Sequence, residues 1–351
     1  MAKHRQERSV GIRDVAALAA VSPATASRAL NGSVTVSDSL RTRVLEAAAV
    51  LGYRPNTLAR SLRRQRTDTI GVVVSDIANP HHSEAVRVME DAASHAGWRL
   101  VLCNTDEQAA KQRTYLRLLA DERVGAVILS AADEAGSGTD ALLDLGIPVV
   151  AFDRVIDDAR VDAVTCDNEG GVRLLTRHLL ELGHRRVAFV GGRHEVATGS
   201  ARLAGYRAAM REAGLRATFE DADFRADLAE LATRRLLRRT PRPTALVVAN
   251  NTMAVGALRA LRDVGLRVPE DVALAAVDDP VWAELVDPPL TTLAQPVRAM
   301  AEAAVRLALE RVAGERADAV RLVLPMELRV RRSSGGPVRV RAPRGGPAAP
   351  G

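Results

Sequence analysis

The chain has 351 residues, enough for two or three domains, and its net charge of +6 is unevenly distributed: residues 1–66 carry +8, residues 331–351 carry +5 and residues 67–330 carry −7. No apolar run approaches the about 18 residues that cross a bilayer, and the N-terminal stretch MAKHRQERSV lacks the apolar segment of a signal peptide, so we expect a cytoplasmic protein without a membrane partner. Cys103 and Cys166 form no CxxC pair, which argues against a disulfide framework and a thiolate metal site.

Residues 11–31 have the pattern of two short helices joined by a tight turn. Apolar residues recur at helical spacing in the first helix, at Ile12, Val15, Ala16 and Ala19. Ser22 has a side chain that caps a helix N-terminus, and Pro23 suits the first helical position, where its missing N–H is not needed. We expect the second helix to pack Ala26, Ala29 and Leu30 inward.

We expect the outward face of this second helix to carry Ala24, Thr25, Ser27 and Arg28, of which the last three supply two hydroxyl groups and a guanidinium group. A short helix with a small-residue back and such a front is typical of the recognition helix of a helix-turn-helix, which enters the DNA major groove. The charge of residues 1–66 favours this interpretation, because a basic segment on an acidic body is expected where one part meets a polyanion. An ordinary helical hairpin is the alternative; anionic lipid is disfavoured because the segment lacks a large apolar face.

A third helix and a short linker complete the N-terminal part. Ser37 is placed to cap the third helix and Gly52 to end it. Its buried stripe consists of Leu40, Val44, Ala47, Ala48 and Leu51. We therefore expect an all-α helix-turn-helix domain over residues 1–53, followed by a linker over residues 54–66. In the linker Asn56 caps a helix of under two turns, which is marginal alone in water, so we expect it to form only against a partner copy and DNA.

From Thr69 onward, short apolar strands alternate with amphipathic helices. The predicted strands are Ile70–Val74, Leu100–Cys103, Ala126–Leu129, Val149–Phe152, Val187–Val190, Ala245–Ala249 and Val272–Val277. The predicted helices include Glu84–Ala96, Thr114–Ala120, Gly170–Leu182, Ala201–Ala213 and Met253–Val264. This alternation indicates doubly wound parallel sheets covered on both faces, and roughly 265 residues are more than one such sheet needs, so we expect two α/β lobes. The Gly-, Pro- and Arg-rich residues 333–351 are predicted to be a disordered basic tail.

Motifs in a fixed order run through both parts. The N-terminal part contains DVAALAAVSPATASRALNGS and LGYRPNTLARSLRRQRTDTIGVVV, and later come IPVVAFDR at 147–154, HLLELGHRRVAFVGG at 178–192, RPTALVVANN at 242–251, LRVPEDVALAAVDD at 266–279 and PPLTTLAQP at 288–296. In these motifs the chain resembles the LacI/GalR family of bacterial transcription regulators from about Gly11 to Arg332. The resemblance implies a helix-turn-helix that reads half of a palindromic operator and a hinge helix that enters the minor groove.

The same resemblance implies the architecture of the remaining chain. Residues 67–332 would form a periplasmic-binding-protein-like core of two lobes, with chain crossings near residues 164 and 294. The core would bind a small-molecule effector and pair with a second copy, giving a homodimer.

By position in the family, the DNA-binding residues of the recognition helix are Ser22, Pro23, Ala24, Thr25, Ser27 and Arg28, and those of the hinge are Asn56, Leu58, Ala59, Arg60 and Leu62. A bidentate pair between Arg28 and guanine would be worth about 1–3 kcal/mol against the wrong base. Thr25 and Ser27 are expected to hold phosphates, which fixes register without reading sequence. Leu62 falls on the leucine that wedges between central base pairs and kinks the duplex; its alternative role is packing on the core.

The resemblance places the effector site at the carboxyl ends of strands, in the crevice between the lobes. The positions that match family ligand contacts are Asp153, Thr198, Arg202, Phe224, Asn250 and Asp278. Carboxylates, an amide and a guanidinium beside one aromatic ring suit hydrogen bonds to sugar hydroxyls with ring stacking. Asp153 and Asp278 have an alternative as helix caps or turn residues. Phe224 has an alternative as a core residue, and Arg202 as half of an interlobe salt bridge.

Three positions depart from the family pattern. His81 and His82 stand where the family often has an aromatic pair, and we expect them to give the effector site a polar lining. A metal site is the weaker interpretation, because no spaced set of Cys, His or carboxylate residues accompanies them, so we expect neither a metal nor a cofactor. Asn251 stands where Asp is common, which removes one carboxylate and leaves the identity of the ligand open.

Together these features predict a sequence-specific DNA-binding repressor of a carbohydrate-utilisation operon, released by a small sugar-like effector. Two alternatives stay open: a corepressed regulator that responds to a purine or another ligand, and a cytosolic small-molecule-binding protein without operator function. An enzyme is disfavoured because the chain contains no GxxxxGK[ST], GxSxG or HExxH motif and no GxGxxG that opens a helix, so we assign no catalytic residues.

Overall fold

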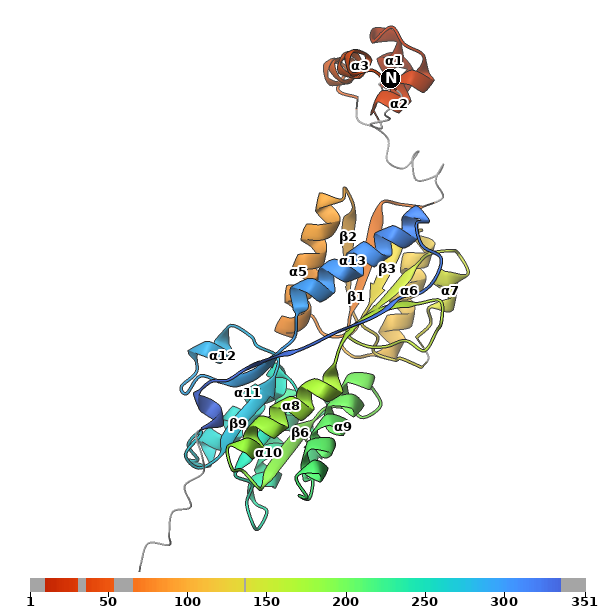
Figure 1. Ribbon diagram of the computed structural model, residues 1–351. Coiled ribbons are helices and arrows are strands. Elements are labelled where there is room, and N and C mark those ends of the chain that lie inside the picture. The colour runs from red at the N-terminus through yellow and green to blue at the C-terminus, as the bar shows by residue number, and fades with distance from the viewer. Residues whose placement is uncertain (1–9, 31–35, 54–65, 136, 336–351) are drawn as a thin grey trace, which may run out of the picture. The chain divides into compact units, whose positions relative to one another are not determined.

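The computed structural model describes residues 10–30, 36–53, 66–135 and 137–335 (Figure 1). The chain divides into two compact units, residues 1–66 and residues 67–351, and each is described by itself. Within the described residues, no helix has both the length and the apolar character that a membrane crossing requires.

The first unit is a small three-helix bundle. Its helices are α1 (Ile12–Leu18), α2 (Pro23–Leu30) and α3 (Asp38–Val50). Pro23 is the first residue of α2, and the Ser22 Oγ accepts a hydrogen bond from the backbone N–H of Thr25 at 3.1 Å. The buried core consists of Val15, Ala16, Ala19, Ala26, Ala29, Val36, Val44, Ala47 and Ala48. The helix-turn-helix fold expected for this part is confirmed.

The second unit contains two lobes, each built on a six-stranded sheet (Figure 1). The sheet of lobe 1 has the order β11-β5-β4-β3-β1-β2, and all its neighbouring strands are parallel. Its strands are β1 (Thr69–Val74), β2 (Arg99–Asn104), β3 (Ala126–Leu129), β4 (Val149–Phe152), β5 (Asp162–Cys166) and β11 (Arg321–Leu324). Val72 and Val74 pack with residues of α5 (Pro80–His95) and α13 (Val297–Ala313), whereas Val73 packs with α6 (Ala109–Asp121) and α7 (Asp140–Leu143). Successive strand residues therefore face opposite helical layers, as in a doubly wound sheet.

The sheet of lobe 2 has the order β12-β10-β9-β8-β6-β7. Its strands are β6 (Val187–Gly191), β7 (Phe219–Asp221), β8 (Ala245–Val248), β9 (Ala273–Val277), β10 (Thr291–Ala294) and β12 (Glu327–Arg329), and β12 alone among them runs antiparallel to its neighbour. Its helices are α8 (Asn168–Glu181), α9 (Ala197–Glu212), α10 (Ala226–Leu237), α11 (Asn251–Asp263) and α12 (Trp282–Leu285). The expected two-lobed α/β core is confirmed.

The chain passes between the lobes at three places. It leaves lobe 1 between β5 and α8, returns between β10 and α13, and crosses again between β11 and β12. The sequence predicts crossings near residues 164 and 294 but not the third, because Pro325 and Met326 between β11 and β12 carry no distinctive pattern.

Several elements differ from the sequence expectation. The strands β5, β7, β10, β11 and β12 were not predicted, since most are short and β11 and β12 alternate between exposed and half-buried residues. Helix α5 begins at Pro80 rather than Glu84, because the Asn79 side chain caps it by accepting the His81 N–H at 3.0 Å. This cap places His81 and His82 in the first turn of the helix.

The predicted disorder from residue 333 is wrong for the start of that segment. Residues Arg332–Ser334 form a short 3-10 helix, η1, in which Ser333 and Ser334 are fully buried. The Ser333 Oγ donates to the Leu274 carbonyl at 2.6 Å and accepts the Thr291 N–H at 2.7 Å. Composition cannot reveal this, because two serines resemble any polar linker until their partners in β9 and β10 are known. Residues 336–351 lie outside the described part.

Candidate functional site

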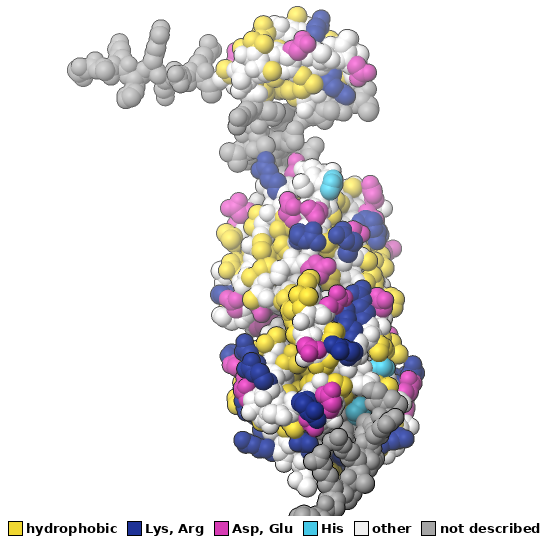
Figure 2. All heavy atoms as spheres, turned by 90° about the vertical axis from the view of Figure 1, so that its left-hand side faces the viewer, with side chains coloured by type: hydrophobic (Ala, Val, Ile, Leu, Met, Phe, Trp, Pro, Cys, Tyr) yellow, Lys and Arg dark blue, Asp and Glu magenta, His cyan; other side chains and the backbone are white. Residues whose placement is uncertain are grey.

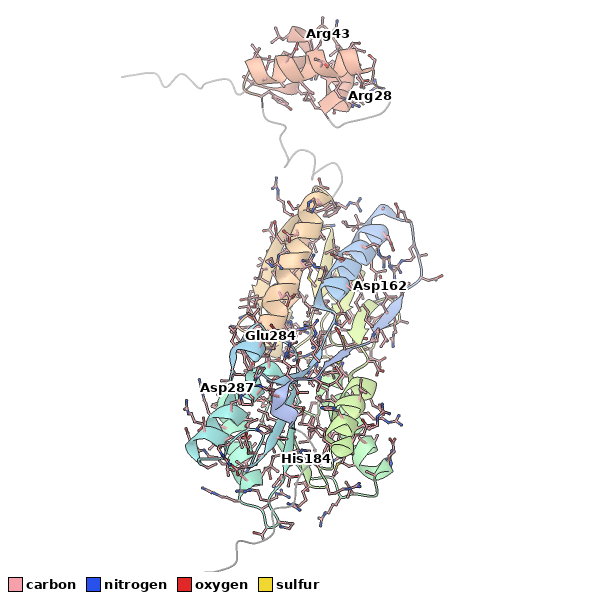
Figure 3. All side chains as sticks on the ribbon, turned by 60° about the vertical axis from the view of Figure 1, so that its left-hand side comes forward. Arg28, Arg43, Asp162, His184, Glu284 and Asp287 are labelled. Atoms are coloured by element: carbon pink, nitrogen blue, oxygen red, sulfur yellow. The ribbon has the colours of Figure 1, made fainter. Side chains whose placement is uncertain are left out.

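The recognition helix α2 presents part of its predicted DNA-binding face to solvent. Ser22, Pro23, Ala24 and Arg28 are exposed, and Thr25 and Ser27 are half-buried. Arg28, labelled in Figure 3, donates from Nε to the Ala24 carbonyl at 3.4 Å. The Ser22 and Thr25 hydroxyl groups lie 2.9 Å apart and share a hydrogen bond. The predicted hinge residues Asn56, Leu58, Ala59, Arg60 and Leu62 lie outside the described residues.

A cavity of about 80 Å³ lies between the two lobes, at the carboxyl ends of their strands. All eight residues predicted for the effector site line it: His81, His82, Asp153, Thr198, Arg202, Phe224, Asn250 and Asp278. The lining also includes eight residues that were not predicted: Ser75, Asp76, Asn79, Glu107, Arg154, Asp223, Arg225 and Gln295. The strand pattern could have indicated Ser75, which directly follows β1, and Arg154, the second residue after β4. Gln295 directly follows β10, a strand that the pattern does not reveal, and the others lie in loops.

The two histidines are buried side by side at the N-terminus of α5. Their rings meet edge to face with centroids 5.1 Å apart, and the His81 ring stacks on Phe152 with centroids 6.1 Å apart. The His82 Nε2 lies 3.0 Å from the Ser75 Oγ. Burial, reinforced by the neighbouring His81, lowers the pKa of His82 to about 3, so this imidazole is neutral at physiological pH.

Asp153 follows β4 in the left-handed region, with φ of +65°. Burial by itself raises the pKa of Asp153, but the facing His81 and Arg202 groups, with His82 and Arg154, lower it by more. The pKa therefore lies below its ordinary value and the carboxylate is ionised. The next residue, Arg154, holds Glu107 through two hydrogen bonds of 2.8 and 2.5 Å and donates to the Ala131 carbonyl at 2.7 Å.

In lobe 2, several lining residues are held by bonds within that lobe. Arg202 donates to the Asn168 Oδ1 and to the Ala249 carbonyl, both at 2.7 Å. Asn250 caps α11 by accepting the Met253 N–H at 2.8 Å. Asp278 accepts hydrogen bonds from the Asn251 N–H at 3.2 Å and the Gln295 side chain at 2.7 Å. Asn250 and Asp278 thus stabilise the start of α11 and line the cavity as well.

Phe224 is the one Phe, Tyr or Trp side chain among the described residues that line the cavity. It is half-buried, with φ of +57°, and its ring lies directly against Gly192. A Cβ atom at Gly192 would come within 2.1 Å of the ring, so only glycine leaves room for Phe224 at that position.

Direct contacts join the lobes around the cavity. The Asn251 side chain of lobe 2 donates to the Asn79 Oδ1 of lobe 1 at 3.0 Å. Both carboxylate oxygens of Glu134 lie 2.9 Å from the Ala197 N–H at the start of α9. Arg193 lies 3.6 Å from Glu107 and donates to the Ala132 carbonyl at 3.3 Å. Arg193 therefore makes the interlobe ion pair that was considered for Arg202.

Several polar atoms of the lining are buried without a hydrogen-bond partner in the described part of the protein. They are both ring nitrogens of His81, the Nδ1 of His82, the Oδ1 of Asp153, the Nε of Arg154 and the Oε1 of Gln295. Buried polar groups in native proteins are nearly always satisfied, so this concentration indicates a place where a polar ligand binds. The described residues contain no group of three or more His, Cys, Asp or Glu side chains arranged to hold a metal ion.

Family models match both parts of the chain. Residues 11–56 match the model for bacterial regulatory proteins of the lacI family, and residues 176–334 match a periplasmic binding protein-like domain. The chain is 35% identical to a ribose operon repressor of Halalkalibacterium halodurans over 93% of its own length and 97% of the relative. It is 36% identical to the transcriptional repressor PurR of Vibrio cholerae, over 86% of this chain and 91% of that one.

Solved structures agree with these matches. A complex of the regulator CelR with cellobiose is 36% identical, with a TM-score of 0.70 over 92% of this chain and 99% of that one. A lac repressor dimer bound to operator and an anti-inducer gives a TM-score of 0.81 at 29% identity, over 93% of this chain and 99% of that one. With the helix-turn-helix, the two-lobed core and the cavity between the lobes, these matches show that the chain belongs to the LacI family, as a DNA-binding repressor with a small-molecule effector.

Proposed function

We propose that the effector is a sugar, that it binds in the cavity between the lobes, and that its binding releases the repressor from a carbohydrate-utilisation operon. The observation that carries this proposal is the set of partnerless polar atoms from His81, His82, Asp153, Arg154 and Gln295 around one small cavity. Hydroxyl groups both donate and accept, so a polyol satisfies such a mixed set better than a ligand of one polarity.

The relatives support the same ligand class. One is named for the ribose operon, a similar structure contains cellobiose, and another LacI-family structure, 27% identical over 77% of this chain, contains ribose. A purine-responsive, corepressed regulator is the second candidate, favoured by the similarity to PurR. The lining weighs against it, because imidazoles and not carbocyclic rings occupy positions 81 and 82, so that Phe224 is the one carbocyclic ring in the described lining on which a base could stack.

The release mechanism follows from the position of the cavity. Because the ligand touches both lobes, its affinity depends on how the lobes are arranged, and by linkage it favours one arrangement over the other. The three chain crossings and the contacts at Asn79, Glu134 and Arg193 are the connections through which such a rearrangement passes. The volume of about 80 Å³ is below the roughly 300–1,000 Å³ of pockets for drug-sized ligands, so entry of a sugar requires the lobes to move apart.

The decisive experiment measures operator binding of the full-length protein against a ligand panel. Fluorescence anisotropy with a palindromic DNA from its own promoter region would be repeated with D-ribose, D-xylose, D-glucose, cellobiose, hypoxanthine and guanine. We expect salt-dependent specific binding that one sugar weakens by about 5- to 150-fold. Tighter binding with a purine would establish the corepressor alternative. If the protein showed no preference for the palindrome over other DNA, the proposal that it regulates an operon through such a site would be rejected.

The DNA contacts are proposed on the recognition helix and the hinge. We expect Arg28→Ala to relax the preference for guanine at one operator position.

Leu62→Ala, in the segment outside the described residues, should weaken specific binding while sugar binding persists, because it removes only the wedge that kinks the duplex. Equal operator affinity in the Leu62 variant would exclude the wedge role.

We propose a homodimer whose interface lies on the face that carries α5 and α12. Figure 2 shows hydrophobic side chains gathered along this face over both lobes. Val281 and Leu285, in and beside α12, are 84% and 78% exposed, and a groove next to them is lined by Val255, Leu258 and Trp282. Exposed apolar groups of this size are typical of interfaces between copies. The charged variants Val281→Glu and Leu285→Glu should shift the protein to monomer in sedimentation velocity, and a dimer that persists would place the interface elsewhere.

A further inference from the structure

The His81 side chain is buried at the cavity, and its two ring nitrogens lack hydrogen bonds. It is 4% exposed, and neither Nδ1 nor Nε2 has a hydrogen-bond partner among the described residues. Its ring is held in place by stacking on Phe152 and by edge contact with His82. An imidazole that only filled space would lose two hydrogen bonds to water without return, at a cost that phenylalanine would avoid. We therefore expect a ligand to form hydrogen bonds with the His81 ring.

Asp153 faces His81 across a gap of defined width. The Nε2 of His81 lies 3.8 Å from the Oδ1 of Asp153, and this carboxylate oxygen, too, is buried without a hydrogen-bond partner in the described structure. The separation exceeds the 2.7–3.2 Å of an N–H···O hydrogen bond, so the two groups do not satisfy each other directly. A ligand oxygen placed to one side of the line that joins these two atoms can lie about 2.8 Å from the Nε2 and from the Oδ1 at once.

The chemistry of the two groups selects what that oxygen must be. The ionised Asp153 only accepts, so the ligand must donate a proton to it. An imidazole with its proton on Nε2 donates, so the same ligand oxygen must accept from His81. A hydroxyl group does both at once, whereas an ether or carbonyl oxygen only accepts.

The guanidinium groups around the cavity already have anionic or carbonyl partners, with only the Nε of Arg154 buried without one among the described residues, and this argues against a phosphorylated or carboxylated sugar. Arg154 is paired with Glu107 and the Ala131 carbonyl, and Arg202 is bonded to Asn168 and the Ala249 carbonyl. Arg225, which also lines the cavity, is bonded to Asp227. An anionic ligand group beside the unpaired Asp153 carboxylate would meet repulsion instead of a free guanidinium.

We infer that His81 and Asp153 together clamp a single hydroxyl group of an uncharged sugar, and that His81 is the residue that decides which sugars carry that hydroxyl in the right place. This inference rests on the proposed sugar effector and adds the atoms that select it. In the clamp the hydroxyl donates to the Asp153 Oδ1 and accepts from the His81 Nε2.

Titration calorimetry on the full-length protein tests the clamp, with D-ribose and its 2-deoxy, 3-deoxy and 5-deoxy analogues, or the matching series for D-glucose if that sugar binds tighter. In the wild-type protein we expect one analogue to bind about 10- to 100-fold more weakly than its parent, because it leaves the buried His81 and Asp153 atoms unsatisfied. In His81→Phe the parent sugar should lose the same factor, and the ratio between the parent and that analogue should fall below about threefold.

Two further variants separate the clamp from general damage to the cavity. His81→Gln keeps an N–H donor near the original Nε2 position, so it should restore the discrimination between the parent and that analogue. His82→Phe removes the ring that is bonded to Ser75. We expect this variant to keep the ratio of affinities between the parent sugar and that analogue, even if every sugar binds to it more weakly. Collapse of the ratio in His82→Phe instead of His81→Phe would overturn the assignment.

The remaining outcomes are equally distinct. If all the deoxy analogues bind the wild-type protein within threefold of the parent, the clamp is wrong, and this result does not depend on the folding of any variant. If sugars bind and release operator DNA but His81→Phe keeps the discrimination, the clamp fails while the proposed function stands. If no sugar binds and none changes operator affinity, both proposals fall.

Discussion

Four lining residues of the cavity adopt backbone conformations that L-residues rarely take. Asp153, Asp223, Phe224 and Asp278 all have positive φ, between +48° and +73°. Such residues cost of order 1–3 kcal/mol each and persist where the surrounding fold enforces them, most often at binding sites. Asp153 and Asp278 each follow a buried strand directly, so the sharp turn of the backbone aims the carboxylate into the crevice.

Asp278 provides a test at this scale. Asp278→Asn retains a side chain that tolerates positive φ but loses the charge and one of the two acceptors that hold Asn251 and Gln295. We expect the affinity for the sugar to fall about 10- to 100-fold with the core still folded, as measured by calorimetry and circular dichroism. Asp287→Asn, at a carboxylate that is 90% exposed, is the matched control. Unchanged sugar affinity would exclude Asp278 from the effector site.

A second carboxylate has a structural role instead. Asp162, labelled in Figure 3, begins β5, is fully buried, and is bonded to Arg311, Arg316 and the Val320 N–H. Burial by itself raises the pKa of Asp162, but the hydrogen bonds from Arg316 and Val320 and the facing Arg311 lower it by more. The pKa is therefore depressed in the folded state, so this carboxylate stabilises the fold above its ordinary pKa and loses that contribution as the pH falls through the lowered value.

Asp162→Asn should lower the free energy of unfolding by about 3–5 kcal/mol at pH 7, because it leaves two partly buried guanidinium groups without their carboxylate. Urea unfolding at a series of pH values checks the sign. The difference between wild type and variant should be greatest near neutral pH and begin to shrink below pH of about 4, where the carboxyl group of the unfolded chain takes up a proton. It should be lost as the pH falls through the lower pKa of the folded state. A difference that is independent of pH would mean that packing, and not charge, stabilises this edge.

Glycines set the distance between packed elements of lobe 2. A Cβ atom on Gly205 of α9 would lie 2.2 Å from the Glu169 carbonyl of α8, and one on Gly256 of α11 would lie 2.0 Å from the Ala226 carbonyl of α10. Both pairs of helices therefore pack with backbones in contact. This close approach sets the positions of α9 and α11 relative to α8 and α10, and the N-terminal ends of α9 and α11 carry Thr198 and Asn250 at the cavity.

The capping of α2 and α3 offers a matched pair of variants. The Ser22 Oγ accepts the Thr25 N–H, whereas Ser37, the cap residue of α3, makes no capping hydrogen bond with its side chain. Ser22→Ala should destabilise the three-helix bundle by about 0.5–2 kcal/mol, and Ser37→Ala by less. Hydrogen exchange of amides in residues 10–53 of the full-length protein measures both. Equal protection in the two variants would show that the Ser22 cap contributes nothing.

At the scale of the whole molecule, two ligands act on one chain from separate sites. In the proposed function the core binds the effector between its lobes, and the helix-turn-helix binds the operator. If effector binding changes operator affinity, the thermodynamic cycle requires operator DNA to change effector affinity by the same factor.

This reciprocity is measurable with the full-length protein. Calorimetric titration with the active sugar, with and without saturating operator duplex, should give dissociation constants that differ by the same factor, about 5- to 150-fold, by which the sugar changes operator affinity. A duplex of scrambled sequence is the control. A sugar affinity that is indifferent to operator would mean that release proceeds by a route other than coupling between these two sites.

The sequence by itself determined the elements with a strong local pattern. The apolar spacing in α1 and α3, the Ser22-Pro23 start of α2 and the buried strands β1, β3, β4, β8 and β9 follow from periodicity and capping, which act between residues close in the chain. The order of the motifs indicated the family, and the family indicated which residues gather at the strand ends.

Only the tertiary structure decided how those residues are partnered. Arg154 and Glu107 are 47 positions apart, and Asn79 and Asn251 are 172 apart, so no local pattern reveals that they bond. The same holds for the third crossing between the lobes and for the buried Ser333 and Ser334. Packing likewise places His81 and Asp153 face to face, 3.8 Å apart, with atoms on both side chains that have no hydrogen-bond partner among the described residues. This arrangement depends on where the start of a helix and the end of a strand meet in space.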